Sequence, residues 1–114
     1  MKIGDICHLN WTPNSGSEMA SNHYGVILSS NGFNTLVPRL IVAPITSKDY
    51  KPFGSLRVPV ESLKNSVHGF ICIDQIRSVD PDSRGLKILN DEISYSCKNQ
   101  CKTVLKKIFG NNSP

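Results

Sequence analysis

The sequence predicts a mainly β domain, a small barrel or curled sheet with one α-helix packed on it at its C-terminal end. As far as Leu89, short apolar runs rich in β-branched residues alternate with Gly, Pro, Asn and Ser turn signals. Beyond that point apolar residues recur every three or four positions, which indicates a helix. The 114 residues are enough for one core without metal or disulfide staples, and no repeat or linker is visible. We therefore expect a single domain over residues 1–114.

The first two strands are predicted on either side of a long loop. "KIGDICHLNW" opens on a Gly-Asp turn and alternates imperfectly, as a half-buried strand does. "TPNSGSEMASNH" has the composition of a loop, and its length is typical of functional or mobile loops in compact domains. "YGVILSS" is a short apolar strand that ends in serines.

The middle of the chain predicts several short strands. "NGFN" is a turn or one turn of helix, and "RLIVAPITSKD" is a strand in which Pro44 indicates an edge or a bulge. "YKPFGSLRVPV" turns a Pro/Gly corner into another strand. "VHGFICIDQIRSVD" holds one strand before Asp74 and a second around residues 76–79, followed by a "PDSRG" turn and an "LKIL" strand.

The last segment, "NDEISYSCKNQCKTVLKKIFGNN", predicts the helix. Asn90 or Asp91 is the expected N-cap, and Gly110 stands at a suitable C-terminal position. The apolar face consists of Ile93, Cys97, Cys101, Val104, Leu105 and Ile108.

Composition narrows the class of protein. The formal net charge of +4 suits an anionic partner such as nucleic acid or an acidic protein. Neither a signal-peptide core nor an apolar run approaching the ~20 residues of a membrane span is visible, so we expect a soluble cytoplasmic protein. The four cysteines form no C-x-x-C pair, and we expect them to be reduced core residues rather than zinc ligands.

Candidate chemistry begins in the long loop and at a strand end. Glu18 is either a solvated acid or a carboxylate that serves as general base or loop organiser. His23 ends the loop, and an unperturbed imidazole titrates near pH ~6.5, so it suits acid–base catalysis. Thr46 and Ser47 follow "API" and form either an ordinary hydroxyl turn or a pair of donors to a phosphate.

A second set of candidates lies in and after the most apolar stretch. Asp74, followed by Gln75, must be paired or face a cleft, because an unpaired charge inside an apolar segment is costly. Arg77 and Arg84 could bind phosphate through their planar guanidinium groups, or pair with the aspartates between them. The three histidines are too scattered for a metal site, and no local catalytic motif is present.

Seven pieces of sequence, in order and at suitable spacing, resemble the MazF/PemK/Kid family of type II toxin–antitoxin toxins. They are "GDI", "P-x-x-GSE", "GVILS", "FN", "IVAPITSK", "G-F-x-x-x-DQIRSVD" and "RG", and the resemblance runs from Gly4 to the C-terminal helix. The resemblance implies an SH3-like β-barrel with a C-terminal helix, usually a homodimer. It also implies sequence-selective cleavage of single-stranded RNA without a metal or other cofactor, and a cognate acidic antitoxin as partner. The implied chemistry is attack of the ribose 2′-OH on phosphorus, giving 2′,3′-cyclic phosphate and 5′-OH ends.

The resemblance assigns roles to the same residues. Catalytic positions fall on Glu18, Thr46 and Asp74, the last being a residue that some members use as base. Substrate-binding positions fall on Ser17, Ser47, Gln75, Arg77 and Arg84.

Two arginines that stabilise the transition state in relatives are replaced here. The family loop commonly reads G-S-E-Q-A-G-x-R-P, whereas this chain has "GSEMASNHY", so His23 stands in place of the arginine. The arginine that some members carry two positions before Asp74 is Cys72. Our hypothesis is that His23 acts as general acid or base or, when protonated, as the cation.

Two alternatives remain open at this point. One is a weak or inactive family member that binds RNA or an antitoxin, which the replaced arginines would explain. The other is a gyrase poison similar to the CcdB toxins, which share the fold. That activity depends on an aromatic-containing C-terminal end, typically with a tryptophan. The lone tryptophan here is Trp11, which counts against it.

Overall fold

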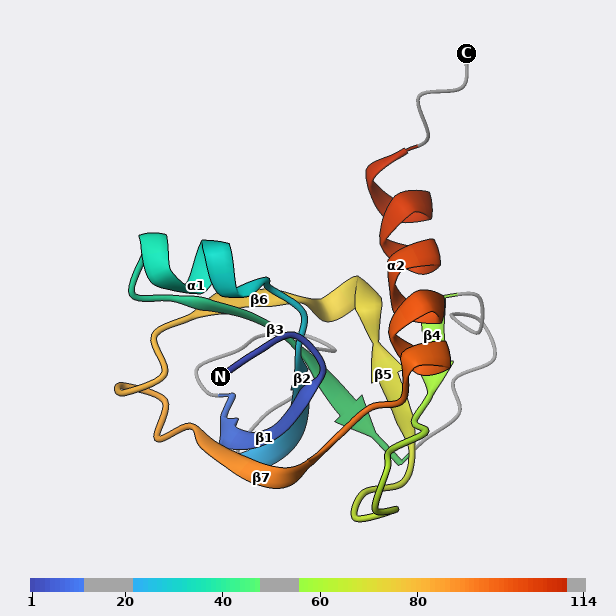
Figure 1. The fold of residues 1–114 in the computed structure, drawn as a ribbon, viewed down its shortest axis with the longest axis horizontal. Helices are drawn as coiled ribbons and strands as arrows, with labels where there is room; N and C mark the ends of the chain where they lie inside the picture. The colour runs from blue at the N-terminus through green and yellow to red at the C-terminus, as the bar shows by residue number, and fades with distance from the viewer. Residues whose placement is uncertain (12–21, 48–55, 111–114) are drawn as a thin grey trace.

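The chain folds as a curled antiparallel sheet with a helix along one side (Figure 1). The computed structural model describes residues 1–11, 22–47 and 56–110. Within these ranges the elements, in chain order, are β1 (Asp5–Asn10), β2 (Asn22–Ile27), α1 (Asn31–Leu36), β3 (Leu40–Thr46), β4 (Arg57–Pro59), β5 (Phe70–Cys72), the 3₁₀ helix η2 (Ile73–Gln75), β6 (Arg77–Val79), β7 (Lys87–Glu92) and α2 (Tyr95–Phe109).

The sheet curls toward a barrel without a continuous closing ladder. Its strand order is β4-β5-β3-β2-β1-β7, with β6 paired to β3 beside β5. The two ends meet after β4 and β7, where Ser62 and Ile93 form an isolated bridge. The Leu63 N–H donates to the Glu92 carbonyl at 3.0 Å, next to this bridge. The predicted mainly β fold with a C-terminal helix is confirmed, and the barrel is a loosely joined one.

Strand β3 is the centre of the sheet. It pairs with β2 along one edge, and with β6 and then β5 along the other. Of the two predicted explanations for Pro44, an edge or a bulge, the edge strand was therefore wrong. Pro44 is buried where β3 changes partner, between the Val42–Arg77 and Ile45–Ile71 pairs, so its missing N–H falls at a break between two ladders.

Apolar side chains form two clusters on the two faces of the sheet. The first lies under α2 and includes Ile6, Val26, Ala43, Ile45, Ile71, Cys97, Cys101 and Val104. The second consists of Cys7, Leu9, Trp11, Ile27, Leu40, Val42 and Val79. All four cysteines are buried without disulfides, as predicted, and burial raises the pKa of the Cys7 thiol to about 12.

The C-terminal helix begins later than the sequence predicts. Ser94, rather than Asn90 or Asp91, is the N-cap, and its hydroxyl accepts from the Cys97 N–H at 3.1 Å. Asn90 and Asp91 belong to β7, which is longer than the predicted "LKIL" strand. Asp91 makes tertiary hydrogen bonds instead, so a long-range contact overrides the local capping signal.

The remaining short elements follow the sequence closely. The "NGFN" stretch begins α1, capped by Ser30, and two short strands flank Asp74 as predicted. The "PDSRG" stretch is a turn. Among the described residues, no helix is long and apolar enough to cross a bilayer.

Candidate functional site

The predicted residues His23 and Thr46 lie just beyond the end of the β2–β3 ladder. The last pair of this antiparallel ladder is Gly25 of β2 with Pro44 of β3. Continued by two residues along each strand, the same register would bring His23 level with Thr46 and onto the same face of the sheet. Ser17 and Glu18, from the preceding loop, lie outside the described residues.

Arg77 shares this face. It is paired with Val42 of β3, which lies on the same face as Thr46 because the two are four residues apart in one strand. Val42 belongs to the apolar cluster on the face opposite α2. His23, Thr46 and Arg77 therefore project from the side of the sheet that the C-terminal helix does not cover (Figure 1).

Thr46 is fixed by close packing at the end of β3. It is buried, with 9% of its surface exposed, and is paired with Phe70 of β5. Gly69 lies directly against it with φ of +134°, and a Cβ atom on Gly69 would stand 2.3 Å from the Thr46 carbonyl oxygen. A glycine is required here both for the backbone angle and for the close approach.

Asp74 lies immediately after β5, in η2, which packs against both β3 and β4. Its carboxylate Oδ1 is 3.2 Å from Nη1 of Arg57, an ion pair whose geometry is not that of a hydrogen bond, and 24% of the Asp74 side chain is exposed. Thr46 is paired with the first residue of β5, Phe70, whereas Asp74 follows the last, Cys72, so the two candidates flank this three-residue strand. The sequence expectation that Asp74 must be paired or face a cleft is met by this ion pair.

Arg57 is the residue that sequence reasoning missed. It opens β4, is directly opposite Cys72 of β5, and leaves 4% of its side chain exposed. The pKa of the Cys72 thiol is raised, first by burial and further by the Asp74 charge, while Arg57 acts in the opposite direction. An arginine between apolar residues in "SLRVPV" was a visible signal, but its partner is apparent only once the β4–β5 register is known.

Trp11 connects His23 with Arg77. Its indole Nε1–H donates to the His23 carbonyl at 3.2 Å, and its own carbonyl accepts from Nη1 of Arg77 at 2.6 Å. The Arg77 guanidinium also lies over the indole ring, 5.6 Å from its centroid, a favourable cation–π geometry. These contacts fix the backbone of β2 at His23 and orient Arg77 along the same face.

The other predicted substrate-binding residues lie around this group. Ser47 is exposed immediately after Thr46. Gln75 is half-buried, and among the described residues no donor reaches its buried Oε1. Arg84 lies in the turn after β6, where its carbonyl accepts from the Asn10 N–H at 2.9 Å. That bond ties the turn to the end of β1, next to Trp11.

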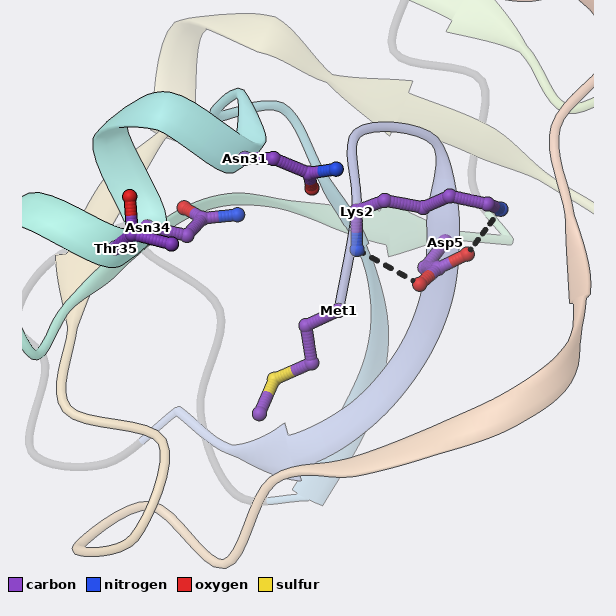
Figure 2. Close-up of a pocket in the computed structure, with 6 residues that line it drawn as sticks. All are labelled: Met1, Lys2, Asp5, Asn31, Asn34 and Thr35. Atoms are coloured by element: carbon purple, nitrogen blue, oxygen red, sulfur yellow. Dashed lines mark hydrogen bonds and ion pairs between the residues drawn. The ribbon is translucent and has the colours of Figure 1, made fainter.

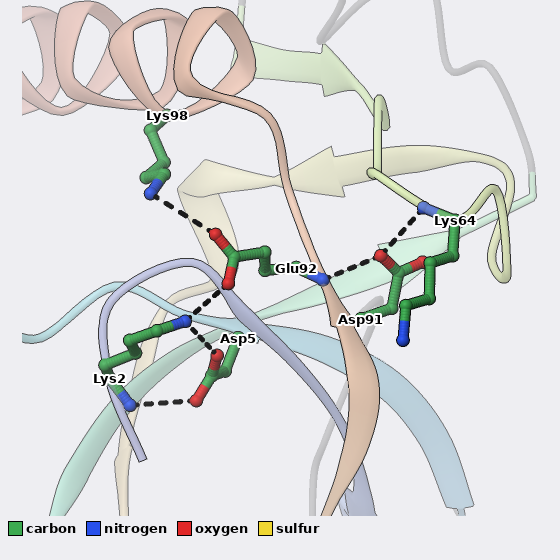
Figure 3. Close-up of polar contacts among 6 residues, drawn as sticks. All are labelled: Lys2, Asp5, Lys64, Asp91, Glu92 and Lys98. Carbon is green, nitrogen blue, oxygen red and sulfur yellow. Dashed lines mark hydrogen bonds and ion pairs between the residues drawn. The ribbon is translucent and has the colours of Figure 1, made fainter.

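Two hollows lie away from these residues. Figure 2 shows one of about 460 Å³, lined in the described part of the chain by Met1, Lys2, Asp5, Asn31, Asn34 and Thr35. The second, beside β7, borders the polar network of Figure 3, in which Lys2 pairs with Asp5 and Glu92, and Lys98 approaches Glu92. The described lining of both hollows includes none of the predicted site residues, so we place the candidate site at the β2–β3–β5 end of the sheet.

The fold and these side chains define a class of protein: a small curled-sheet domain with imidazole, hydroxyl, carboxylate and guanidinium groups suited to an anionic ligand. The chain belongs to the PemK-like, MazF-like toxins of type II toxin–antitoxin systems, whose family model matches residues 2–109. It is similar to the endoribonuclease toxin ChpB of Escherichia coli (strain K12), with 32% identity over 83 residues, or 71% of each chain.

Solved structures share the fold at lower identity. The chain is similar to MazF from Deinococcus radiodurans, with a TM-score of 0.84, 24% identity and 97% of each chain covered. It is also similar to a mycobacterial endoribonuclease in complex with its cognate antitoxin, with a TM-score of 0.78, 17% identity, and 100% of this chain and 99% of that chain covered. The predicted MazF-type fold is confirmed.

Proposed function

We propose that this toxin is a metal-independent endoribonuclease that cuts single-stranded RNA, including mRNA, at selected sequences. The observation that carries the proposal is that Thr46 and Asp74 flank the short strand β5, with His23 near the end of the neighbouring β2–β3 ladder. The family resemblance gives catalytic roles to Thr46 and Asp74, and His23 stands in place of a catalytic arginine. The similarity to an endoribonuclease toxin supports the same reaction.

The reaction needs one group to remove a proton and another to supply one. We assign proton removal from the ribose 2′-OH to the Asp74 carboxylate. As O2′ bonds to phosphorus, the bond from phosphorus to O5′ breaks, and protonated His23 donates a proton to the departing O5′. The products are a 2′,3′-cyclic phosphate and a 5′-OH, and the requirement for a 2′-OH restricts the substrate to RNA.

The developing negative charge on phosphorus needs donors and cations nearby. The Thr46 hydroxyl, at the end of β3, is one such donor. Substrate contacts are assigned to Ser17, Ser47, Gln75, Arg77 and Arg84, and Glu18 keeps its proposed catalytic role in the loop. Arg77 is already oriented by Trp11, so it can meet a phosphate with little further ordering.

The proposed partners follow from the family and from charge. We expect a cognate antitoxin with an acidic segment, attracted by the formal net charge of +4, and a homodimeric toxin. The mycobacterial relative was solved with its antitoxin. We also expect the protein to act in the cytoplasm, where mRNA is accessible.

Incubation with a long single-stranded RNA in EDTA, followed by mapping of the ends, tests this function. We expect discrete cuts with 5′-OH ends, and a rate about 100-fold lower for His23→Ala. The matched control is His68→Ala, because the His68 side chain is exposed and has no assigned role, and this variant should cut normally. Undiminished cutting by His23→Ala would refute the role of the imidazole.

The other outcomes identify the alternatives. Binding without cleavage would indicate an inactive relative, and intact RNA together with gyrase-dependent DNA breaks would indicate a CcdB-like poison. Trp11 is 1% exposed and packed in the sheet, so it is not presented to a partner as the gyrase activity requires.

A further inference from the structure

Arg57 is a buried charge that neither the sequence motifs nor the family resemblance explains. The residue is 7% exposed, in a three-residue strand whose next residue, Val58, belongs to the main apolar cluster. Placing a guanidinium in such a position is costly unless it is paired. A smaller apolar residue would fill a strand position with less cost, so the arginine needs a specific reason.

The ion pair with Asp74 is asymmetric. Arg57 leaves 4% of its side chain exposed, whereas Asp74 leaves 24% exposed. The guanidinium is therefore the inner member of the pair and the carboxylate the outer one. A substrate approaching this face can reach Asp74, but the carboxylate lies between it and Arg57.

The β4–β5 ladder explains how the positive charge reaches this place. Arg57 and Cys72 are directly opposite each other, so their side chains lie on the same face, with Cβ atoms typically ~5 Å apart. Cys72 occupies the position, two residues before Asp74, where an arginine is expected from the resemblance. Strand β4 thus brings the guanidinium of Arg57 to the carboxylate of Asp74.

We propose that Arg57 is a positioning residue for Asp74, holding it by charge, with Nη1 3.2 Å from Oδ1, so that the exposed part of the carboxylate faces the substrate. This inference rests on the proposed function, in which Asp74 accepts the 2′-OH proton. In the described structure Arg57 from β4 is the charged partner of Asp74, and the thiol of Cys72 from β5, whose pKa is raised, lies near both. Arg57 touches no reacting atom, and its effect on the rate passes through Asp74.

A double-mutant cycle tests this dependence with single-turnover cleavage of a short RNA that contains a mapped cut site. Arg57→Met keeps the length of the side chain and removes the charge, and we expect a rate about 100-fold lower. The RNA dissociation constant should change less than about 3-fold, because Arg57 lies behind the carboxylate. In an Asp74→Asn background the same substitution should lower the rate by less than about 3-fold.

Two rescue variants distinguish positioning from a general structural role. Arg57→Lys keeps the charge but loses the planar fork, and should recover part of the rate. Arg57→Thr combined with Cys72→Arg moves the guanidinium across the ladder and should recover more. Thermal unfolding of each variant shows whether the protein tested is folded.

The inference is overturned if Arg57→Met cuts at the wild-type rate, or if its loss is equally large in the Asp74→Asn background. If Arg57→Met does not fold, the double variant Arg57→Thr with Cys72→Arg decides. A folded double variant that cuts RNA faster than Arg57→Thr alone supports positioning, and one that cuts as slowly as Arg57→Thr refutes it. A wild-type protein that leaves RNA intact refutes the proposed function, and this inference with it. A wild-type protein that cuts, with an Arg57→Met variant that cuts equally well, refutes the inference alone.

Discussion

Asp74 and Asp91 are two carboxylates drawn into the folded chain, and their surroundings differ. Asp91 is 8% exposed and accepts from the Lys64 N–H, the Ser66 N–H and the Ser66 hydroxyl, at 3.0, 3.2 and 2.6 Å. Asp74 is held through one oxygen by Arg57, and 24% of its side chain is exposed. Figure 3 shows Asp91 on β7, bonded to the backbone of Lys64 and next to Glu92, which joins Lys2 near the N-terminus to Lys98 of α2.

The difference separates a structural carboxylate from one available to a substrate. The oxygens of Asp91 are occupied by groups of the 64–66 segment, so it fastens that segment to β7. Asp74 pairs with Arg57 on its inner side and is partly exposed on its outer side, as the proton acceptor that we propose has to be. Both residues are aspartates, and we infer that the number of hydrogen-bond donors fixed around each carboxylate decides whether it is structural or available to a substrate.

The largest effect that this comparison predicts is on catalysis. Asp74→Asn should lower the single-turnover rate of RNA cleavage about 1000-fold, since an amide cannot accept the 2′-OH proton. Asp91→Asn, measured at a temperature at which it is folded, should cut within a few-fold of wild type. Equal losses in the two variants would remove the distinction between the two carboxylates.

The next largest effect concerns the backbone behind Thr46. Gly69→Ala should destabilise the protein by about 3 kcal/mol and slow cleavage, because the new Cβ meets the Thr46 carbonyl and the φ of +134° disfavours alanine. Gly85→Ala is the matched control, with φ of +58° and open space around it. Gly85→Ala should lower the free energy of unfolding by only about 1 kcal/mol and leave the cleavage rate unchanged. Denaturant unfolding and cleavage rates of the two variants check the difference.

Asp91→Ala should cost about 2 kcal/mol of unfolding free energy, because it leaves donors of the 64–66 segment unsatisfied. Burial raises the pKa of Asp91, but hydrogen bonds from Ser66 and its neighbours outweigh this and hold the pKa below its ordinary value. The contribution of Asp91 is therefore present above pH ~4, the unfolded pKa, and is lost as the pH falls toward the folded pKa. Thermal unfolding between pH 7 and pH 2.5 should show a weaker acid dependence for the variant than for wild type.

The smallest predicted effect is at Trp11. Trp11→Phe removes the Nε1–H bond to the His23 carbonyl but keeps an aromatic ring beneath Arg77. We expect a loss of about 1 kcal/mol in stability and a rate within about 10-fold of wild type. A cleavage rate that falls by more than this in a variant of nearly wild-type stability would show that the indole does more than hold the β2 backbone.

The sequence predicted those parts of the fold that depend on local pattern. Alternating apolar runs and the change of period indicated the strands and α2, and "DQIRSVD" placed Asp74 between two short strands. The exceptions are residues whose roles depend on distant partners. Asp91 looked like a helix cap because the groups that hold it lie about 25 residues away along the chain. Pro44 looked like an edge residue because the change of partner along β3 has no local signal.

The site was predicted less completely for the same reason. His23, Thr46 and Asp74 were found as residue types at the ends of predicted strands, and the first two lie just beyond the end of the β2–β3 ladder. Arg57 was not found, because its relation to Asp74 depends on which residue of β5 lies opposite β4. The arginine in "SLRVPV" can be seen in the sequence, whereas its burial and its ion pair with Asp74 can be seen only in the fold.

The division of labour between His23 and Asp74 is the central claim, and a leaving-group substitution tests it most directly. In an RNA with a bridging 5′-sulfur at the cut site, the departing thiolate needs no proton from an acid. We predict that this substrate restores His23→Ala to near the wild-type rate and leaves Asp74→Asn as slow as before. Rescue of Asp74→Asn, or no rescue of His23→Ala, would contradict the assignment of acid and base.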